Sequence, residues 1–203
     1  MTQIISWITT NYIELLGFLF GIIYVLLAMR QNIWCWLSGI INVSLYIIIF
    51  LHAKLYGDMA LQIFYLVMSF YGWYNWLKKK NSKSASLIVS QINSKTTIIL
   101  IIITPLAALL FGYILTFTPS DVPYWDGLTT ALGLVATWMT AKKILENWLV
   151  WIFANILCVG IYYYKELYPT MIFYFVLAIC AIAGYYQWKK ELNINENLNT
   201  AEN

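Results

Sequence analysis

Long apolar stretches alternate with short polar connections along the chain, and the stretches are similar in length. A helix needs about 20 mostly apolar residues to cross a bilayer. On that length the pattern predicts seven transmembrane helices, which span residues 12–29, 33–51, 57–77, 96–117, 124–142, 147–164 and 168–188. The chain is therefore expected to be an all-α integral membrane protein.

The composition leads to the same class. Of the 203 residues, 62% are hydrophobic and 10% are charged, whereas soluble globular proteins average about 45–50% apolar and about 25% charged residues. A water-soluble single domain is excluded. Residues 1–11 contain no Lys or Arg, so the first apolar stretch is interpreted as a spanning helix and not as a signal peptide.

Basic residues are distributed unevenly over the connections between the predicted helices. Ten lie in alternate connections on one side: Arg30, Lys78, Lys79, Lys80, Lys83, Lys95, Lys142, Lys143, Lys189 and Lys190. Only Lys54 and Lys165 lie on the other side. The positive-inside rule therefore places the N-terminus outside and the C-terminus in the cytoplasm. Residues 78–95 are then a cytoplasmic basic loop and residues 189–203 a cytoplasmic polar tail, both expected to be solvated.

The sequence contains an internal duplication. It is visible when the chain is aligned with a copy of itself in the register that pairs Glu14 with Asp126, which we call the repeat alignment. In this repeat alignment the other matches also fall on informative residue types: Gly21 with Gly133, Arg30 with Lys142, Trp36 with Trp148, Tyr56 with Tyr168, Met59 with Met171, Gly72 with Gly184 and Trp76 with Trp188. We infer two parallel three-helix repeats, residues 12–77 and 124–188, joined by a linker helix over 96–117. Transporters built this way bind substrate near the bilayer midplane, where the repeats meet.

The middles of the predicted spans contain no ionisable residue. A catalytic or metal site in the membrane would need such residues, as would most ion-coupled transporters. We therefore expect no enzyme activity, no metal and no cofactor. The basic residues form no single face, so nucleic acid is not an expected partner, and the lipid bilayer is. Cys35, Cys158 and Cys180 lie in apolar stretches without metal-ligand spacing and are interpreted as small hydrophobic residues.

Neutral polar and aromatic residues remain as candidates for binding. On the span 147–164 one helical face carries Trp148, Trp151, Asn155 and Tyr162, on 57–77 a seam contains Gln62, Tyr65 and Ser69, and on 33–51 Asn42 is the amide. Two alternatives stay open, since tryptophans also form interfacial belts and amides also join helices. A cavity lined by these groups suits a flat, hydroxylated ring that can be cationic, and it offers a phosphate no counter-ion.

Several stretches together resemble the PnuC family of bacterial vitamin transporters. They are RQNIWCW at 30–36, YGWYNW at 71–76, WDGLTTA at 125–131, ENWLVW at 146–151, YKELYPT at 164–170 and GYYQWKK at 184–190, and the resemblance covers about residues 12–190. It implies a seven-helix, SWEET-like fold in the bacterial inner membrane. It also identifies Trp148 and Trp151 as the family's WxxW binding motif, and it adds Tyr174 as a candidate on the last span.

The resemblance further implies facilitated diffusion of an unphosphorylated vitamin, which a cytosolic kinase then traps. Members differ in cargo, and nicotinamide riboside is favoured on family frequency. Thiamine, carried by the PnuT branch, is the alternative; a riboflavin or deoxynucleoside carrier and a non-transporting membrane protein are less favoured. Self-association into a homo-oligomer is left open.

Overall fold

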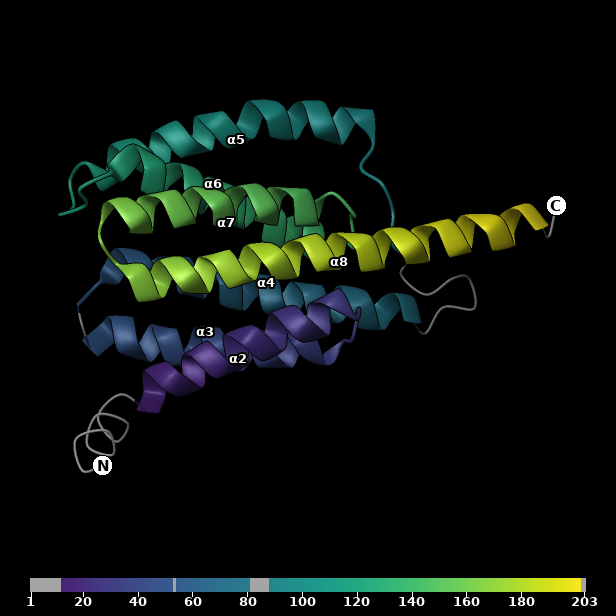
Figure 1. Ribbon diagram of the computed structural model, residues 1–203, viewed down its shortest axis with the longest axis horizontal. Coiled ribbons are helices and arrows are strands. Elements are labelled where there is room, and N and C mark those ends of the chain that lie inside the picture. Colours follow the sequence, from purple (N-terminus) through teal and green to yellow (C-terminus); the bar gives the residue numbers. More distant parts are fainter. Residues whose placement is uncertain (1–11, 53, 81–87, 202–203) are drawn as a thin grey trace. The chain divides into compact units, whose positions relative to one another are not determined.

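The computed structural model describes residues 12–52, 54–80 and 88–201. The predicted helices are all present there: α2 (Tyr12–Met29), α3 (Trp34–His52), α4 (Tyr56–Lys80), α5 (Ser94–Leu115), α6 (Pro123–Ala141), α7 (Asn147–Tyr164) and α8 (Tyr168–Ala201) (Figure 1). The all-helical prediction is therefore confirmed. The helices fall into two compact units, with α2–α4 in residues 1–82 and α5–α8 in residues 83–203.

Five helices of the described residues are long and apolar enough to cross a membrane, namely α2, α3, α5, α7 and the part of α8 up to Ile194. The other two, α4 and α6, have sufficient lengths of 25 and 19 residues but are more polar. In α6 the polar side chains are satisfied locally, since Thr137 donates a hydrogen bond to the Gly133 carbonyl at 2.8 Å. Neighbouring helices cover α6, which contacts both α5 and α7. The chain is a multi-pass membrane protein.

In the first unit, α3 lies against both α2 and α4. The closest approach is at Gly72 of α4, where the Trp36 ring occupies the space that a Cβ atom would need. Trp36 also meets Trp76 edge to face, with ring centroids 5.4 Å apart and an interplanar angle of 87°. Trp36 is completely buried, so these aromatic contacts form the core of the unit.

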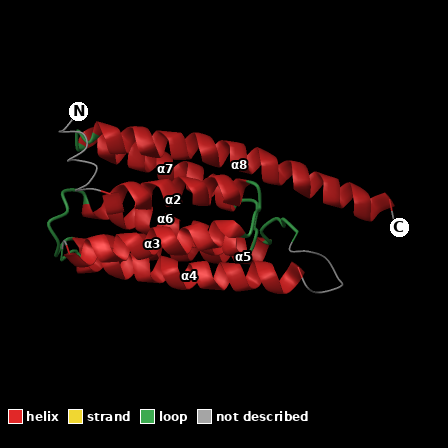
Figure 2. Ribbon diagram, turned by 90° about the horizontal axis from the view of Figure 1, so that it is seen from below, coloured by secondary structure: helices red, strands yellow, loops and turns green. Residues whose placement is uncertain are grey.

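In the second unit, each helix from α5 to α8 contacts the next one along the chain. The helices α7 and α8 run side by side, as both ribbon views show (Figure 2). At the α5–α6 contact a Cβ atom on Gly127 would stand 2.7 Å from the Ala108 carbonyl oxygen, so only glycine fits. Helix α8 continues to Ala201 instead of ending at residue 188. Residues 189–201 contain no Gly or Pro to stop it.

The connections within the two units repeat in the same alignment that pairs Glu14 with Asp126. Gln31 and Lys143 adopt positive φ angles of 52° and 53°, and Lys54 and Glu166 both adopt 57°. The surrounding backbone bonds repeat as well: the amide of residue 32 donates to the carbonyl of 27 at 2.9 Å, and that of 144 donates to 139 at 3.0 Å. The two halves of the chain therefore use the same turn conformations.

Part of the expected basic loop is ordered against the second unit. The strap, residues 88–92, pairs with the α6–α7 turn through a parallel bridge between Ser90 and Ile144. The Ser90 amide donates to the Lys143 carbonyl at 3.0 Å, and the Ser90 carbonyl accepts from the Leu145 amide at 2.9 Å. Val89 is buried with 2% of its surface exposed. The expectation of a solvated loop is wrong at Val89, whereas Ser90 and Gln91 are exposed. Residues 81–87 lie outside the described residues.

Candidate functional site

Trp148, a predicted binding residue, packs between α7 and α8. Its ring lies 2.7 Å from the position of a Cβ atom on Gly184, and it meets Trp188 edge to face at 5.4 Å and 89°. The side chain is 3% exposed, and its buried indole N–H has no hydrogen-bond partner among the residues described. This burial excludes an interfacial belt position for Trp148 and gives it the packing role that Trp36 has in the first unit.

Trp151 lies one turn further along α7 and is half-buried. Its indole N–H donates to the Thr140 hydroxyl of α6 at 3.5 Å. Thr140 in turn lies 3.1 Å from the Asn147 side-chain carbonyl, to which it donates. The nitrogen of the same Asn147 amide donates to the Ile144 carbonyl at 2.6 Å. The edge of the Trp151 ring is therefore tied to the end of α6.

Asn155 follows Trp151 by four residues on α7, so the two side chains share a face. It is 5% exposed, and within the described part of the chain its side chain makes no hydrogen bond. Asn155 is thus a polar group with unused hydrogen-bonding capacity on the same helical face as Trp151.

Tyr162 and Tyr174 meet near the other end of α7. Their rings are stacked, with centroids 5.2 Å apart and an interplanar angle of 11°. Because a helix rises 1.5 Å per residue, Tyr162 lies about 16 Å along α7 from Trp151. The predicted residues of the second unit therefore lie in two places, with Trp151 and Asn155 one turn apart on a face of α7 and Tyr162 stacked on Tyr174.

The candidates of the first unit are engaged differently. Asn42 donates from its amide nitrogen to the Gly17 carbonyl of α2 at 2.6 Å, which is the interhelical bond that the sequence left as an alternative. Ser69 is buried and donates to the Tyr65 carbonyl at 2.8 Å within α4. Tyr65 and Gln62 are half-buried, and the Gln62 amide makes no hydrogen bond to a described residue. Of the two candidate amides of this unit, Gln62 is therefore the one without a hydrogen bond to a described residue.

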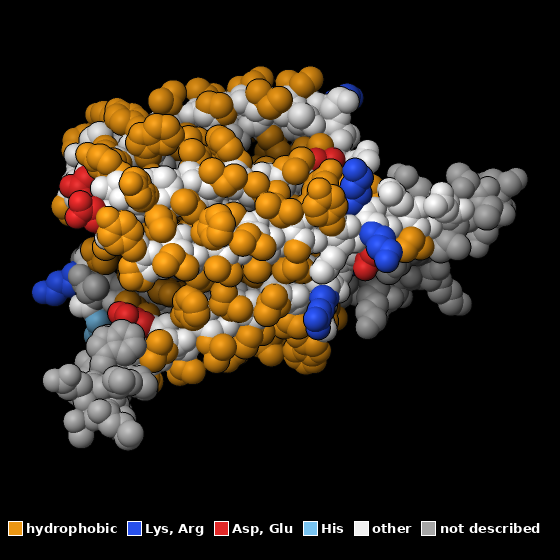
Figure 3. All heavy atoms as spheres, viewed as in Figure 1, with side chains coloured by type: hydrophobic (Ala, Val, Ile, Leu, Met, Phe, Trp, Pro, Cys, Tyr) orange, Lys and Arg blue, Asp and Glu red, His pale blue; other side chains and the backbone are white. Residues whose placement is uncertain are grey.

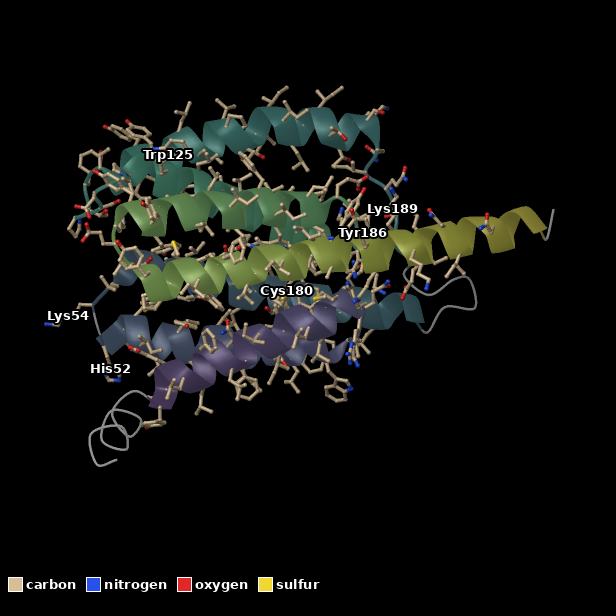
Figure 4. All side chains as sticks on the ribbon, in the orientation of Figure 1. His52, Lys54, Trp125, Cys180, Tyr186 and Lys189 are labelled. Atoms are coloured by element: carbon tan, nitrogen blue, oxygen red, sulfur yellow. The ribbon has the colours of Figure 1, made fainter. Side chains whose placement is uncertain are left out.

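Charged groups lie near helix ends. At the start of α6, Asp126 forms an ion pair with Lys165 at 3.7 Å and accepts a hydrogen bond from Ser120 at 2.6 Å. Figure 3 shows one face of the molecule, on which hydrophobic side chains cover the middle of the helices and Lys, Arg, Asp and Glu lie toward the ends. Within the second unit, Trp125 and Lys189 lie toward opposite ends (Figure 4). No group of three potential metal ligands occurs among the described residues.

Sequence reasoning missed Thr140, Asn147 and the contact of Glu146 with the strap, where the Glu146 carboxylate accepts from the Ile92 amide at 3.0 Å. These residues lie near the ends of the predicted spans 124–142 and 147–164. One signal was available. Asn147 is a polar residue directly before WxxW, at the first position of a predicted span.

Comparison with known proteins agrees with this architecture. A family model described as nicotinamide mononucleotide transporter matches residues 11–190. A nicotinamide riboside transporter PnuC of Escherichia coli is 26% identical, covering 88% of this chain and 85% of its own length. The PnuC of Haemophilus influenzae is 27% identical, covering 94% and 85%.

A solved structure has a similar fold. The crystal structure of the vitamin B3 transporter PnuC aligns with a TM-score of 0.73 at 21% identity, covering 95% of this chain and 86% of that one. Together with the family model, which matches most of the chain, these findings show that the protein belongs to the nicotinamide mononucleotide transporter family.

Proposed function

We propose that the protein carries nicotinamide riboside, without a phosphate, across the bacterial inner membrane. The observation that carries the proposal is the pairing of Trp151 with the unpartnered amide of Asn155 on one face of a helix without charges. A ring face and an amide suit a hydroxylated aromatic cation. The curated relatives quoted above are named nicotinamide riboside transporters.

The phosphorylated form of the ligand, named in the family description, fits less well. A phosphate is bound by Arg, Lys or a helix N-terminus. In α7 and in the membrane part of α8 there is no Lys or Arg, and the nearest basic residues flank the helices, such as Lys142 and Lys189. The dephosphorylated riboside is therefore the proposed cargo, and a cytosolic kinase would trap it after entry.

Facilitated diffusion is the proposed mode of transport. No Asp, Glu, Lys, Arg or His lies in the middle of a spanning stretch of the described residues, so the chain offers no such group at that depth for a coupling proton or sodium ion. Uptake into protein-loaded vesicles should reach equilibrium without accumulation. Accumulation that follows an imposed pH or sodium gradient would contradict this mode.

We also infer that all seven helices cross the membrane as two three-helix repeats joined by α5, with the N-terminus outside. The repeated turn conformations and the matching Trp–Gly contacts support this arrangement, and the distribution of Lys and Arg supports the orientation. An impermeant thiol reagent added outside should label Thr118→Cys and spare Glu191→Cys. The opposite labelling would reverse the orientation.

The cargo is tested by calorimetric titration of the purified protein. Nicotinamide riboside should bind, and nicotinamide mononucleotide should bind at least about tenfold more weakly, because its phosphate finds no counter-charge. Thiamine and riboflavin serve as comparison ligands. Tight binding of thiamine without binding of the riboside would replace the proposed cargo.

The site is tested with Trp151→Ala and Asn155→Leu. Each should weaken riboside binding by about 1–2 kcal/mol, which is roughly tenfold, because a ring face or a hydrogen-bonding amide is lost. Trp34→Ala is the control, since Trp34 is 57% exposed at the start of α3. Gln62→Leu and Tyr65→Phe test the candidates of the first unit in the same assay. If Trp151→Ala, Asn155→Leu and the control bound the riboside with equal affinity, the binding site would not lie on this face of α7.

A further inference from the structure

A chain of buried polar groups links the end of α6 to Trp151. Thr140 is 2% exposed and Asn147 is fully buried. The Thr140 hydroxyl lies within 3.1 Å of the Asn147 carbonyl oxygen and within 2.8 Å of the Ala136 carbonyl, so its single hydrogen has two acceptors. Its oxygen remains available to accept from the Trp151 indole N–H at 3.5 Å.

Asn147 is itself held at both ends of its amide. Its carbonyl oxygen accepts from Thr140, and its nitrogen donates to the Ile144 carbonyl at 2.6 Å. Ile144 belongs to the turn that the strap clamps through the Ser90 bridge. A buried amide or hydroxyl that loses its partner costs about 1–3 kcal/mol, so turning the Thr140 or Asn147 side chain away from its partners is unfavourable. The 3.5 Å hydrogen bond links the indole edge of Trp151 to this chain of groups, and it uses the edge of the ring and not its faces.

The first unit lacks this chain, although it shares the surrounding packing. In the repeat alignment, Thr140, Asn147 and Trp151 correspond to Ala28, Cys35 and Gly39. The α2–α3 turn and the Trp36–Gly72 contact form there without these groups. The hydrogen-bonded chain is therefore not required for the packing of the two helices, and its presence in the second unit needs a separate reason.

We propose that Thr140 and Asn147 are positioning residues that fix the orientation of the Trp151 ring for the cargo. The inference rests on the proposed function, in which Trp151 contacts the vitamin. Without the Thr140 hydroxyl the indole has more rotamers in the free protein, and binding has to select one of them at an entropic cost. The same ring contacts then give weaker binding.

The test compares Thr140→Val, which keeps the shape and removes the hydroxyl, with Thr140→Ser, which keeps the hydroxyl. Calorimetry with nicotinamide riboside should give about fivefold weaker binding for Thr140→Val and near wild-type binding for Thr140→Ser. In a Trp151→Phe background, which has no indole N–H, Thr140→Val should cause no further loss. An equal loss in both backgrounds would show a general structural effect and overturn the proposal.

A second measurement reads the ring directly. In protein labelled with 5-fluorotryptophan, the ¹⁹F resonance that disappears in Trp151→Phe should shift or broaden in Thr140→Val and return in Thr140→Ser. An unchanged resonance in Thr140→Val overturns the proposal whatever the affinities. If the wild-type protein binds no vitamin, the proposed function fails. The ¹⁹F resonance then decides by itself whether Thr140 orients the Trp151 ring. If Thr140→Val does not fold, Thr140→Cys, with its weaker acceptor, replaces it under the same criteria.

Discussion

The helices α2–α4 and α6–α8 share their packing contacts but differ in their polar candidates. In both sets a tryptophan ring fills the space beside a glycine and meets a second tryptophan at 5.4 Å. Both sets also have positive φ angles at the same two turn positions. These features hold neighbouring helices together, and they occupy equivalent positions in the repeat alignment.

Most of the candidate binding residues do not repeat in this way. In the same alignment most of them are paired with apolar or small residues: Trp151 with Gly39, Asn155 with Val43, Tyr162 with Phe50, Asn42 with Ala154, Tyr65 with Leu177 and Ser69 with Ala181. The exception is Gln62, which is paired with Tyr174, so that this position carries a candidate in both sets. The duplicated Trp and Gly residues thus form packing contacts, whereas most polar candidates lie at positions that differ between the two sets. This distinction explains why Trp148, which has an equivalent in Trp36, is a packing residue although it belongs to the WxxW motif.

The largest effect is expected when a duplicated packing position is filled. Gly184→Ala places a methyl group against the Trp148 ring, and Gly72→Ala does the same against Trp36. Each should destabilise the protein by about 1–3 kcal/mol, because overpacking displaces a buried ring. Thermal unfolding in detergent, followed by tryptophan fluorescence, measures the loss.

Gly160→Ala is the matched control within α7. No atom lies within 4 Å of the position its Cβ atom would take, and alanine favours helix over glycine by about 0.5–1 kcal/mol. This variant should be as stable as the wild type or more stable. If Gly160→Ala destabilised the protein as much as Gly184→Ala, the loss would not come from the contact between Trp148 and Gly184.

The next effect separates the two amides. Asn42→Leu removes the bond to the Gly17 carbonyl and should lower stability by about 1 kcal/mol without changing riboside affinity. Asn155→Leu removes no such bond and should lower affinity with little loss of stability. Asn42→Leu should therefore lower the melting temperature and leave the calorimetric affinity unchanged. Asn155→Leu should lower the affinity and leave the melting temperature nearly unchanged. The same pattern in both would show that the amides have one role.

The helices could be predicted well because each long apolar stretch must be a helix to satisfy its backbone in lipid. The duplication singled out Trp36 and Trp148 as equivalent, and the structure gives both the same packing contact with a glycine. What could not be predicted is which amide meets a partner, since helical spacing alone does not distinguish the surroundings of Asn42 from those of Asn155. The strap was missed because its order depends on pairing with a turn far away in the chain, and no local pattern encodes that contact.

A smaller effect concerns the strap, which the first unit does not have within its described residues. Glu146 corresponds to the exposed Trp34 in the repeat alignment. Glu146→Ala removes the acceptor for the Ile92 amide and should lower stability by about 1 kcal/mol or less. Hydrogen–deuterium exchange of residues 88–92 should become faster. Unchanged exchange would mean that the Ser90 bridge alone holds the strap.

The smallest effect is expected at the duplicated turn positions. Lys54 and Glu166 are exposed and adopt a φ angle of 57°, which costs a residue with a Cβ atom about 1–2 kcal/mol. Glycine avoids this cost but loses more backbone entropy on folding. Lys54→Gly and Glu166→Gly should therefore each be neutral or raise the melting temperature slightly. A clear loss in either variant would show that its side chain makes a stabilising contact.

The strap also constrains the order in which the second unit is completed. Ile92 and Glu146 are 54 residues apart, and α5 and α6 lie between them. During synthesis the strap leaves the ribosome before its partner turn exists, so its backbone groups stay hydrogen-bonded to water until α6 has been made. Closing this loop comes after the local helix contacts have formed. Ribosome-bound chains that end before residue 143 thus carry an open strap, and the α6–α7 turn is clamped only once its own residues have emerged.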